Sequence, residues 1–165
     1  MTEAPATADI EACETLALFS RLLETSVNRA LQRQFGVSLE EHAVLSLLHR
    51  SGGQVLHVTD VATSLGFSRS RVSRCVNRQC LRGRLSRTPC PRDARAAHVA
   101  LTEQGTAFVQ QLGRAYRAAV RAGLGSLHIG SEDVTELVRR LPPLTERYTR
   151  LRPLSACSGR PRPTA

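Results

Sequence analysis

The side chains with the clearest chemical potential lie in residues 69–82, where basic and small polar groups share one face of an expected helix. At 100° per residue, the outer face carries hydroxyl, amide and guanidinium groups: Ser70, Ser73, Arg74, Asn77 and Arg78. The inner face carries Val72, Cys75, Val76 and Gln79. Arginine can pair bidentately with guanine and asparagine with adenine, while serine tolerates either base. A solvated surface helix usually mixes acidic and basic residues, whereas this outer face has no acid. The pattern therefore favours a surface that reads DNA bases over an ordinary solvated helix.

The residues before this helix predict how it is presented. Residues 65–68, Leu-Gly-Phe-Ser, form a tight turn between two short helices, as in a helix-turn-helix unit. The second helix of such a unit enters the major groove, and its N-terminus favours phosphate. The residues predicted to bind DNA from this helix are Ser68, Arg69, Ser70, Arg71, Ser73, Arg74, Asn77 and Arg78.

A β-hairpin is expected after Gly83. Residues 84–87 and 98–101 alternate like strands, and residues 88–94 between them are rich in proline and charge, which predicts a loop. Arg92 and Arg95 stand at its tip, where a narrow minor groove would attract them. We expect Asp93 to bond Arg95 or loop amides and so to shape this second DNA-binding element.

Composition supports a polyanionic partner. The 165-residue, 18.0 kDa chain has a net charge of +9, and all 23 basic residues are arginine. Nine arginines and one acid lie between Arg69 and Arg95, so the charge forms a patch. There is no secretory signal and no apolar stretch of membrane length, so a cytoplasmic location is expected. No phosphate loop, nucleophile elbow or close carboxylate pair is present, and the chain is not expected to be an enzyme.

The flanking segments predict further helices, which would position the helix-turn-helix unit and the hairpin. A first helix with an apolar stripe through Leu23 and Val27 ends at Gly36, and Ser38 with Glu41 forms a capping box. Thr59-Asp60 should open a short helix that ends at Gly66. Thr102 caps a long helix, and residues 124–130 form a break. Ser131 caps a last helix that is kinked at Pro142-Pro143, and its inward residues are Val134, Leu137, Val138 and Leu141.

The outer helices carry more apolar surface than a head of this size can cover. A second copy could bury the remainder through a self-complementary twofold contact. Two reading helices would then lie ~34 Å apart, one turn of DNA. This reasoning predicts a homodimer that presents two reading helices to the same DNA.

Several of these motifs together resemble the MarR family of bacterial winged helix-turn-helix regulators. The resemblance rests on residues 67–74, Arg82-Gly83, Arg92-Asp93-Ala94-Arg95-Ala96, and Leu101-Thr102-Glu103-Gln104-Gly105. It implies a mainly α fold with a small β-hairpin (α+β): a winged head plus a helical dimerisation arm. It also implies repression from a palindromic operator, with release by a small aromatic or phenolic effector between arm and head. By the same match Asp93 and Arg95 are the wing pair.

The resemblance gives a division of the chain. Residues 1–37 would be an N-terminal dimerisation helix and residues 38–101 the winged helix-turn-helix DNA-binding region. Residues 102–154 would complete the arm, followed by a disordered tail at 155–165. The sequence departs from the family at Gln79, where leucine is usual, and at Arg84, where an apolar residue is usual. Because Gln79 is on the inner face of its helix, its buried amide would need hydrogen-bond partners. Pro142-Pro143 is a further departure.

Other functions stay open at this point. Cys90 lies between two prolines near Arg92, which could lower its thiol pKa, so a thiol-redox-responsive regulator is one alternative. A non-specific nucleic-acid-binding or architectural protein is another. His42, His49 and His57 lack the spacing of a metal site, and no metal or other cofactor is expected.

Overall fold

The computed structural model describes residues 7–90 and 93–139, and the side chains of these residues apart from 90 and 93–96. This part of the chain is mainly helical with a small antiparallel sheet, as predicted. The elements in order are α1 (Thr7–Phe35), α2 (Leu39–Arg50), β1 (Leu56–His57), α3 (Val58–Leu65), α4 (Arg69–Leu81), β2 (Leu85–Cys90), β3 (Asp93–Leu101), α5 (Glu103–Ser126) and α6 (Ser131–Arg139).

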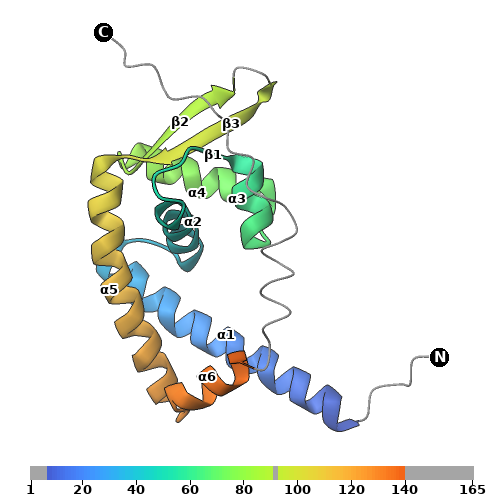
Figure 1. Ribbon diagram of the computed structural model, residues 1–165. Helices are drawn as coiled ribbons and strands as arrows, with labels where there is room; N and C mark the ends of the chain where they lie inside the picture. Colours follow the sequence, from blue (N-terminus) through green and yellow to red (C-terminus); the bar gives the residue numbers. More distant parts are fainter. Residues whose placement is uncertain (1–6, 91–92, 140–165) are drawn as a thin grey trace, which may run out of the picture.

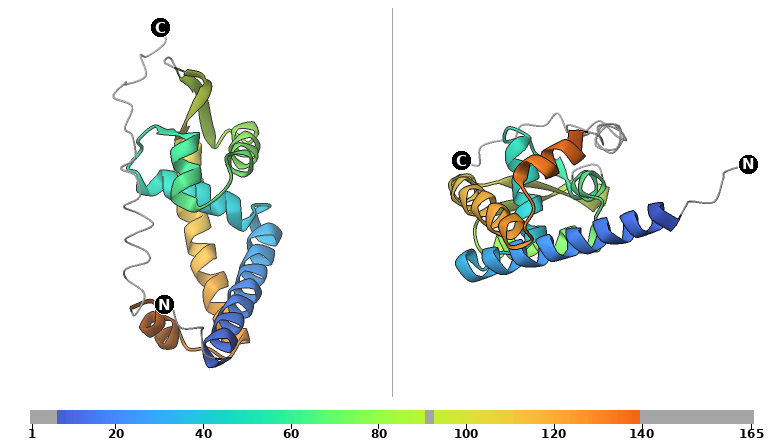
Figure 2. Two further views of the ribbon diagram at one scale, coloured as in Figure 1. Left: turned by 90° about the vertical axis from the view of Figure 1, so that its right-hand side faces the viewer. Right: turned by 90° about the horizontal axis from the view of Figure 1, so that it is seen from below.

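The molecule has a head and an arm (Figure 1). The head consists of α2, α3, α4 and the sheet, and the β2–β3 hairpin projects from it. Helix α5 leads from the sheet to α6 and packs along α1 on its way. The N-terminal half of α1 extends beyond α6, away from the head (Figures 1 and 2).

One hydrophobic core joins head and arm. Its fully buried side chains come from the end of α1, from α2, from both helices of the turn, from the sheet and from α5: Leu31, Val44, Leu45, Leu48, Val61, Val72, Val76, Val99 and Leu112. Burial of such aliphatic side chains is the main stabilising contribution to the fold. Because the core includes the inner face of α4, the outer face of that helix is held in a fixed orientation.

The predicted helix ends are confirmed at the turns that orient α4. Ser38 and Glu41 form a complete capping box at α2. Gly66 ends α3 in the left-handed region with φ +64°, a conformation that glycine adopts without a Cβ clash. Ser68 caps α4 by accepting a hydrogen bond from the amide of Arg71. Thr102 caps α5 in the same way.

The hairpin differs from the prediction, because its strands continue into the proline-containing stretch. Strand β2 extends to Cys90 and β3 begins at Asp93, so residues 88–94 are not simply a loop. The strand order β1-β3-β2 places β2 at an edge, where Pro89 is tolerated since an edge strand leaves some N–H positions unpaired. The sequence also missed β1, whose two residues pair with Val99 and His98 of β3.

The end of α5 was predicted too early. The helix continues to Ser126, and Ile129 N donates to Leu124 O at 3.1 Å, which is the closing bond of a Schellman turn. The left-handed position of that turn is His128 with φ +54°, a place usually taken by glycine. Helix α5 therefore ends at a histidine, and a histidine does not predict a helix end as a glycine would.

Helix α6 corrects two further predictions. It begins at Ser131, and the contact at its start is from the amide of Gly130 to Asp133 Oδ2 at 3.0 Å, so Ser131 is not its cap. Leu137 and Val138 were expected to face inward, yet they are 38% and 55% exposed. Val134 is half-buried. Leu141, also expected to face inward, and the predicted kink at Pro142-Pro143 lie outside the described residues.

Candidate nucleic-acid interface

Helix α4 presents the two faces that its periodicity predicts. Its inner residues are buried: Val72, Cys75, Val76 and Gln79. On the outer side Arg69, Ser70, Arg74 and Asn77 are exposed and Ser73 is half-buried. Leu81 is 89% exposed, so it does not pack on the hairpin. The outer surface of α4 thus offers hydrogen-bond donors to a groove, with no acid of its own helix beside them.

Two of the predicted DNA-binding arginines instead contact α2. Arg71 Nε lies 3.0 Å from Glu40 Oε1, and its guanidinium also covers the ring of Phe67. Arg78 Nε lies 3.1 Å from Glu41 Oε1. The structure therefore divides the predicted set, placing Ser70, Arg74 and Asn77 on the open face and tying Arg71 and Arg78 to the acids at the start of α2.

The buried amide of Gln79 has partners on both sides. Gln79 is fully buried, and its Nε2 donates to Glu41 Oε1 at 2.9 Å. Its Oε1 accepts a hydrogen bond from Arg84 Nη1 at 3.1 Å. Glu41 also accepts from the amide of Ser38 through Oε2 at 2.8 Å. The polar residue within this core is therefore satisfied, as buried polar groups must be.

Arg84 connects this network to α5. Its guanidinium carbon lies 3.4 Å from the centre of the Phe108 ring, a cation–π contact. Burial lowers the pKa of Arg84 from its ordinary value, and the nearby charge of Arg82 lowers it further. The two departures from the family pattern, Gln79 and Arg84, are therefore partners, and together they link α2, α4, the start of β2 and α5.

The hairpin contributes an arginine that the sequence analysis did not select. Arg87 of β2 donates from Nη1 to Asn77 Oδ1 at 2.8 Å. Side chains two residues apart point to the same face of a strand, so Arg87 shares the side of buried Leu85, the side that packs on α4. This contact joins the hairpin to the predicted reading helix.

Two of the predicted wing residues, Asp93 and Arg95, lie on the projecting hairpin. Asp93 and Arg95 belong to β3, and Cys90 is the last residue of β2 and pairs in register with Asp93. The side chains of these three residues, and the whole of Arg92, lie outside the described part, so the expected bond between Asp93 and Arg95 stays a prediction.

Two of the described cysteines, Cys75 and Cys80, are poor candidates for thiolate chemistry. Burial raises the pKa of Cys75 and of Cys80, which disfavours the reactive thiolate. Cys75 lies in the core, as expected from its position on the inner face of α4. Within residues 7–90 and 93–139 no three metal-ligating side chains come together. His57 instead meets His98 across β1 and β3, with the Nε2 atoms 3.3 Å apart.

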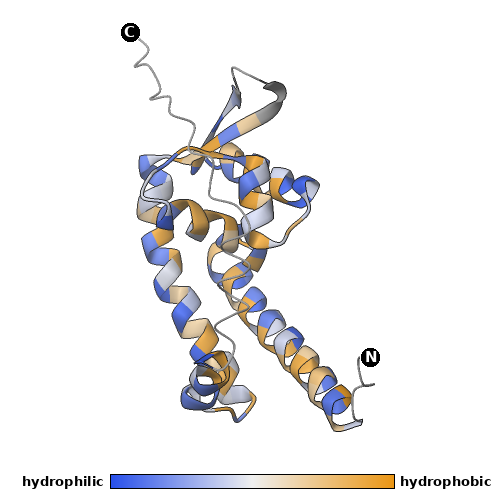
Figure 3. Ribbon diagram, turned by 45° about the vertical axis from the view of Figure 1, so that its right-hand side comes forward, coloured by the Kyte–Doolittle hydropathy of each residue, from blue (hydrophilic) through white to orange (hydrophobic). Residues whose placement is uncertain are grey.

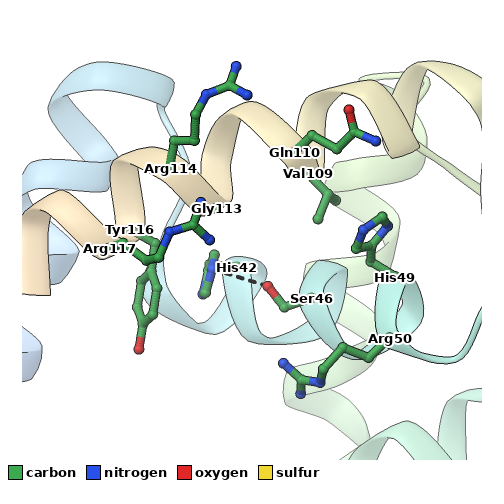
Figure 4. Close-up of a pocket in the computed structure, with 10 residues that line it drawn as sticks. All are labelled: His42, Ser46, His49, Arg50, Val109, Gln110, Gly113, Arg114, Tyr116 and Arg117. Carbon is green, nitrogen blue, oxygen red and sulfur yellow. Dashed lines mark hydrogen bonds between the residues drawn. The ribbon is translucent and has the colours of Figure 1, made fainter.

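Two pockets flank α2 where the head joins the arm. The first, of 580 Å³, lies between α2 and α5, and its lining includes Arg50, Arg114 and Arg117 and no carboxylate (Figure 4). The second, of 890 Å³, is lined by residues of α1, α2, the α3–α4 turn and α4, and by Tyr116 of α5. His42 and Tyr116 line both and stack on each other, with ring centres 4.0 Å apart.

His42 is buried at this junction between head and arm. It is 8% exposed, and its Nε2 lies 3.1 Å from Ser46 Oγ. Burial lowers its pKa to about 4, with a further contribution from the charge of Arg50. The imidazole is therefore neutral at pH 7, and it offers a flat, uncharged surface within an arginine-lined cavity.

Sequence reasoning missed the pocket residues because they come from helices that lie far apart in the sequence and form no local motif. It also missed Arg87, since alternation alone does not reveal which face of an exposed hairpin contacts α4. The Gln79–Arg84 pair did carry a signal: two polar residues with matching donors and acceptors stand five positions apart where apolar residues are usual in the resembled family.

No helix in the described ranges has the length and apolar character needed to cross a bilayer. The MarR family model matches residues 35–96, from the end of α1 to the hairpin. No curated protein has a sequence that matches this chain.

Three solved structures from Streptomyces coelicolor share the fold, all MarR family transcriptional regulators. AbsC is 29% identical, with a TM-score of 0.70 over 88% of this chain and 97% of AbsC. Sco3205, solved in complex with DNA, is 24% identical, with a TM-score of 0.73 over 88% of this chain and 91% of its own. Sco5413 is 20% identical, with a TM-score of 0.74 over 90% and 100%.

Proposed function

We propose that the chain is a winged helix-turn-helix transcriptional regulator of the MarR family and that it binds double-stranded DNA sequence-specifically, because the family model matches residues 35–96 and the similar AbsC is a MarR family regulator. The observation that carries the proposal is the outer face of α4, where Ser70, Arg74 and Asn77 stand together on a helix anchored by its buried side. These groups can read base edges in a major groove. The similar structure of Sco3205 contains DNA, which supports this use of the fold.

The remaining arginines suit backbone and minor-groove contacts. Arg69 lies at the N-terminus of α4, where helix polarity also favours phosphate. Arg95 belongs to strand β3 of the projecting hairpin, and the sequence predicts Arg92 at the tip; we assign both arginines to the flanking minor groove, with Asp93 shaping the tip. Arg71 and Arg78 act in this proposal by fixing α4 against α2.

The arm is the proposed contact surface for a second copy of the chain. Large apolar side chains are exposed on α1, at Ile10, Leu16, Leu18 and Leu22, and on α6, at Leu137 and Val138. Figure 3 shows apolar positions along the projecting half of α1. Several exposed large apolar side chains on one part of a protein are typical of a surface that contacts another protein. We propose a twofold dimer through α1 and the C-terminal helices, which places two heads on a palindromic operator.

A small anionic aromatic molecule is the proposed effector. Both pockets touch the arm, the head and the stacked His42–Tyr116 pair, so a molecule bound there contacts elements whose relative position sets the distance between heads. The three arginines of the first pocket favour a carboxylate or phenolate. Such a ligand can release DNA only if it binds more tightly to an arrangement of the two heads that does not fit the operator than to the arrangement that does.

A competition shift assay tests DNA reading. A duplex selected by the protein from a random pool is competed against random duplex, and we expect a preference of roughly 10³ or more. Arg74→Ala should reduce the affinity for the selected duplex by ~1–3 kcal/mol and relax base preference. Arg121→Ala removes the same charge from an exposed position on α5 and is the matched control.

A non-specific nucleic-acid-binding protein gives the opposite result. Selected and random duplexes would compete equally, both affinities would fall steeply with salt, and Arg74→Ala and Arg121→Ala would behave alike. That outcome would reject sequence-specific reading by α4.

A further inference from the structure

The contact between the hairpin and the reading helix fixes which atom of Asn77 faces outward. A guanidinium group has donors and no acceptor, so the atom 2.8 Å from Arg87 Nη1 must be the amide oxygen of Asn77 and not its nitrogen. The amide nitrogen is therefore the group left on the other side. Because both side chains are exposed, this arrangement is available before DNA binds.

We propose that Arg87 is a positioning residue that sets the base preference of Asn77, an inference that rests on the proposed reading of DNA by α4. With Arg87 bonded to Oδ1, the amide can no longer rotate freely and presents its NH₂ group to the groove as a donor. A donor favours bases that show an acceptor at the groove edge, such as N7 or O6 of guanine. Without Arg87, either end of the amide can face the base.

The surroundings of Arg87 favour this role over that of an incidental surface charge. Arg87 is on the β2 face that packs on α4, opposite Val99 of β3, which is fully buried. Its strand starts beside Arg84, which is itself held by Gln79 and Phe108. The strand that carries Arg87 is therefore anchored at its base, and the guanidinium approaches Asn77 from a defined direction.

Base preference at the position read by Asn77 tests the proposal. Selection from a random pool locates that position as the one whose preference disappears in Asn77→Ala. Arg87→Ala should reduce the preference there by about 5-fold or more, the scale of one lost specific contact, and leave the other positions unchanged. Arg87→Lys keeps a donor and should retain most of the preference.

A double variant separates positioning from a direct phosphate contact. If Arg87 acts through Asn77, adding Arg87→Ala to Asn77→Ala causes no further change in base preference and lowers affinity by no more than the loss of one charge does, whereas loss of a direct phosphate contact lowers affinity by more than that. Arg121→Ala is the charge control. If Arg87→Ala weakens binding uniformly across sequences, or Arg87→Lys fails to restore preference, the positioning role is rejected.

Failure of this inference is distinguishable from failure of the proposed function. A wild-type protein that selects no sequence overturns both. A wild-type protein that selects a defined site, with an Arg87→Ala variant that selects the same site equally well, overturns only the role of Arg87.

Discussion

Replacing Gln79 with leucine should destabilise the protein, although leucine is the more apolar residue in a fully buried position. The change removes the bond from Gln79 Nε2 to Glu41 and the bond from Arg84 to Gln79 Oε1. Both partners are charged, and a hydrogen bond to a charged group contributes ~1.5–3 kcal/mol. Glu41 keeps Ser38 and Arg78, and the new side chain contributes apolar packing of ~1–2 kcal/mol. We expect the free energy of unfolding to fall by ~2–4 kcal/mol.

Urea unfolding at fixed protein concentration measures this loss, since a dimer's stability depends on concentration. Adding Arg84→Leu to Gln79→Leu removes the stranded cation and should recover ~1 kcal/mol or more, a coupling typical of contacting residues. Leu81→Gln is the control on the same helix and should change stability by under ~0.5 kcal/mol, because Leu81 is exposed. A Gln79→Leu variant as stable as the wild type, or a double variant with no recovery, would show that the network contributes nothing to stability.

Three further predictions concern the arm, the junction and the first turn of α5. Leu18→Glu places a charge on the exposed apolar surface of α1 and should shift the protein toward monomer in light scattering; an unchanged dimer would argue for a different interface. His42 has a pKa of about 4 in the folded protein and 6.5 in the unfolded chain, so the unfolded chain takes up a proton first as pH falls. The free energy of unfolding should therefore be constant with respect to His42 above pH 6.5 and should decrease by at most about 3 kcal/mol between pH 6.5 and pH 4. Urea titrations across that range should show a shallower decrease for His42→Gln, and parallel curves would contradict this assignment. Gly105→Ala puts a Cβ 2.0 Å from the backbone oxygen of Arg84, and its thermal midpoint should drop far more than that of Gly125→Ala, where nothing lies within 4 Å; equal midpoints would contradict the close approach.

The sequence was sufficient to predict the elements whose signals are local. Capping at Ser38, Ser68 and Thr102 and the stop at Gly66 depend on residues within one turn, and each was found where expected. The two faces of α4 followed from periodicity, because burial of one side is imposed by a repeat of 3.6 residues.

The features that could not be predicted depend on contacts between distant segments. The extent of β2 and β3 is decided by cross-strand pairing, and Pro89 is accommodated only because β2 is an edge. The end of α5 uses His128 in a conformation that composition does not reveal. The assignment of Arg71 and Arg78 to α2 required knowing where Glu40 and Glu41 lie in space.

The most direct test of the central claim is the symmetry of the DNA that the protein selects from a random duplex pool. Two copies joined through α1, each presenting one α4, predict a twofold-symmetric site with half-site centres ~10 base pairs, or one helical turn, apart. Enrichment of an asymmetric site, or of no sequence at all, would contradict the account.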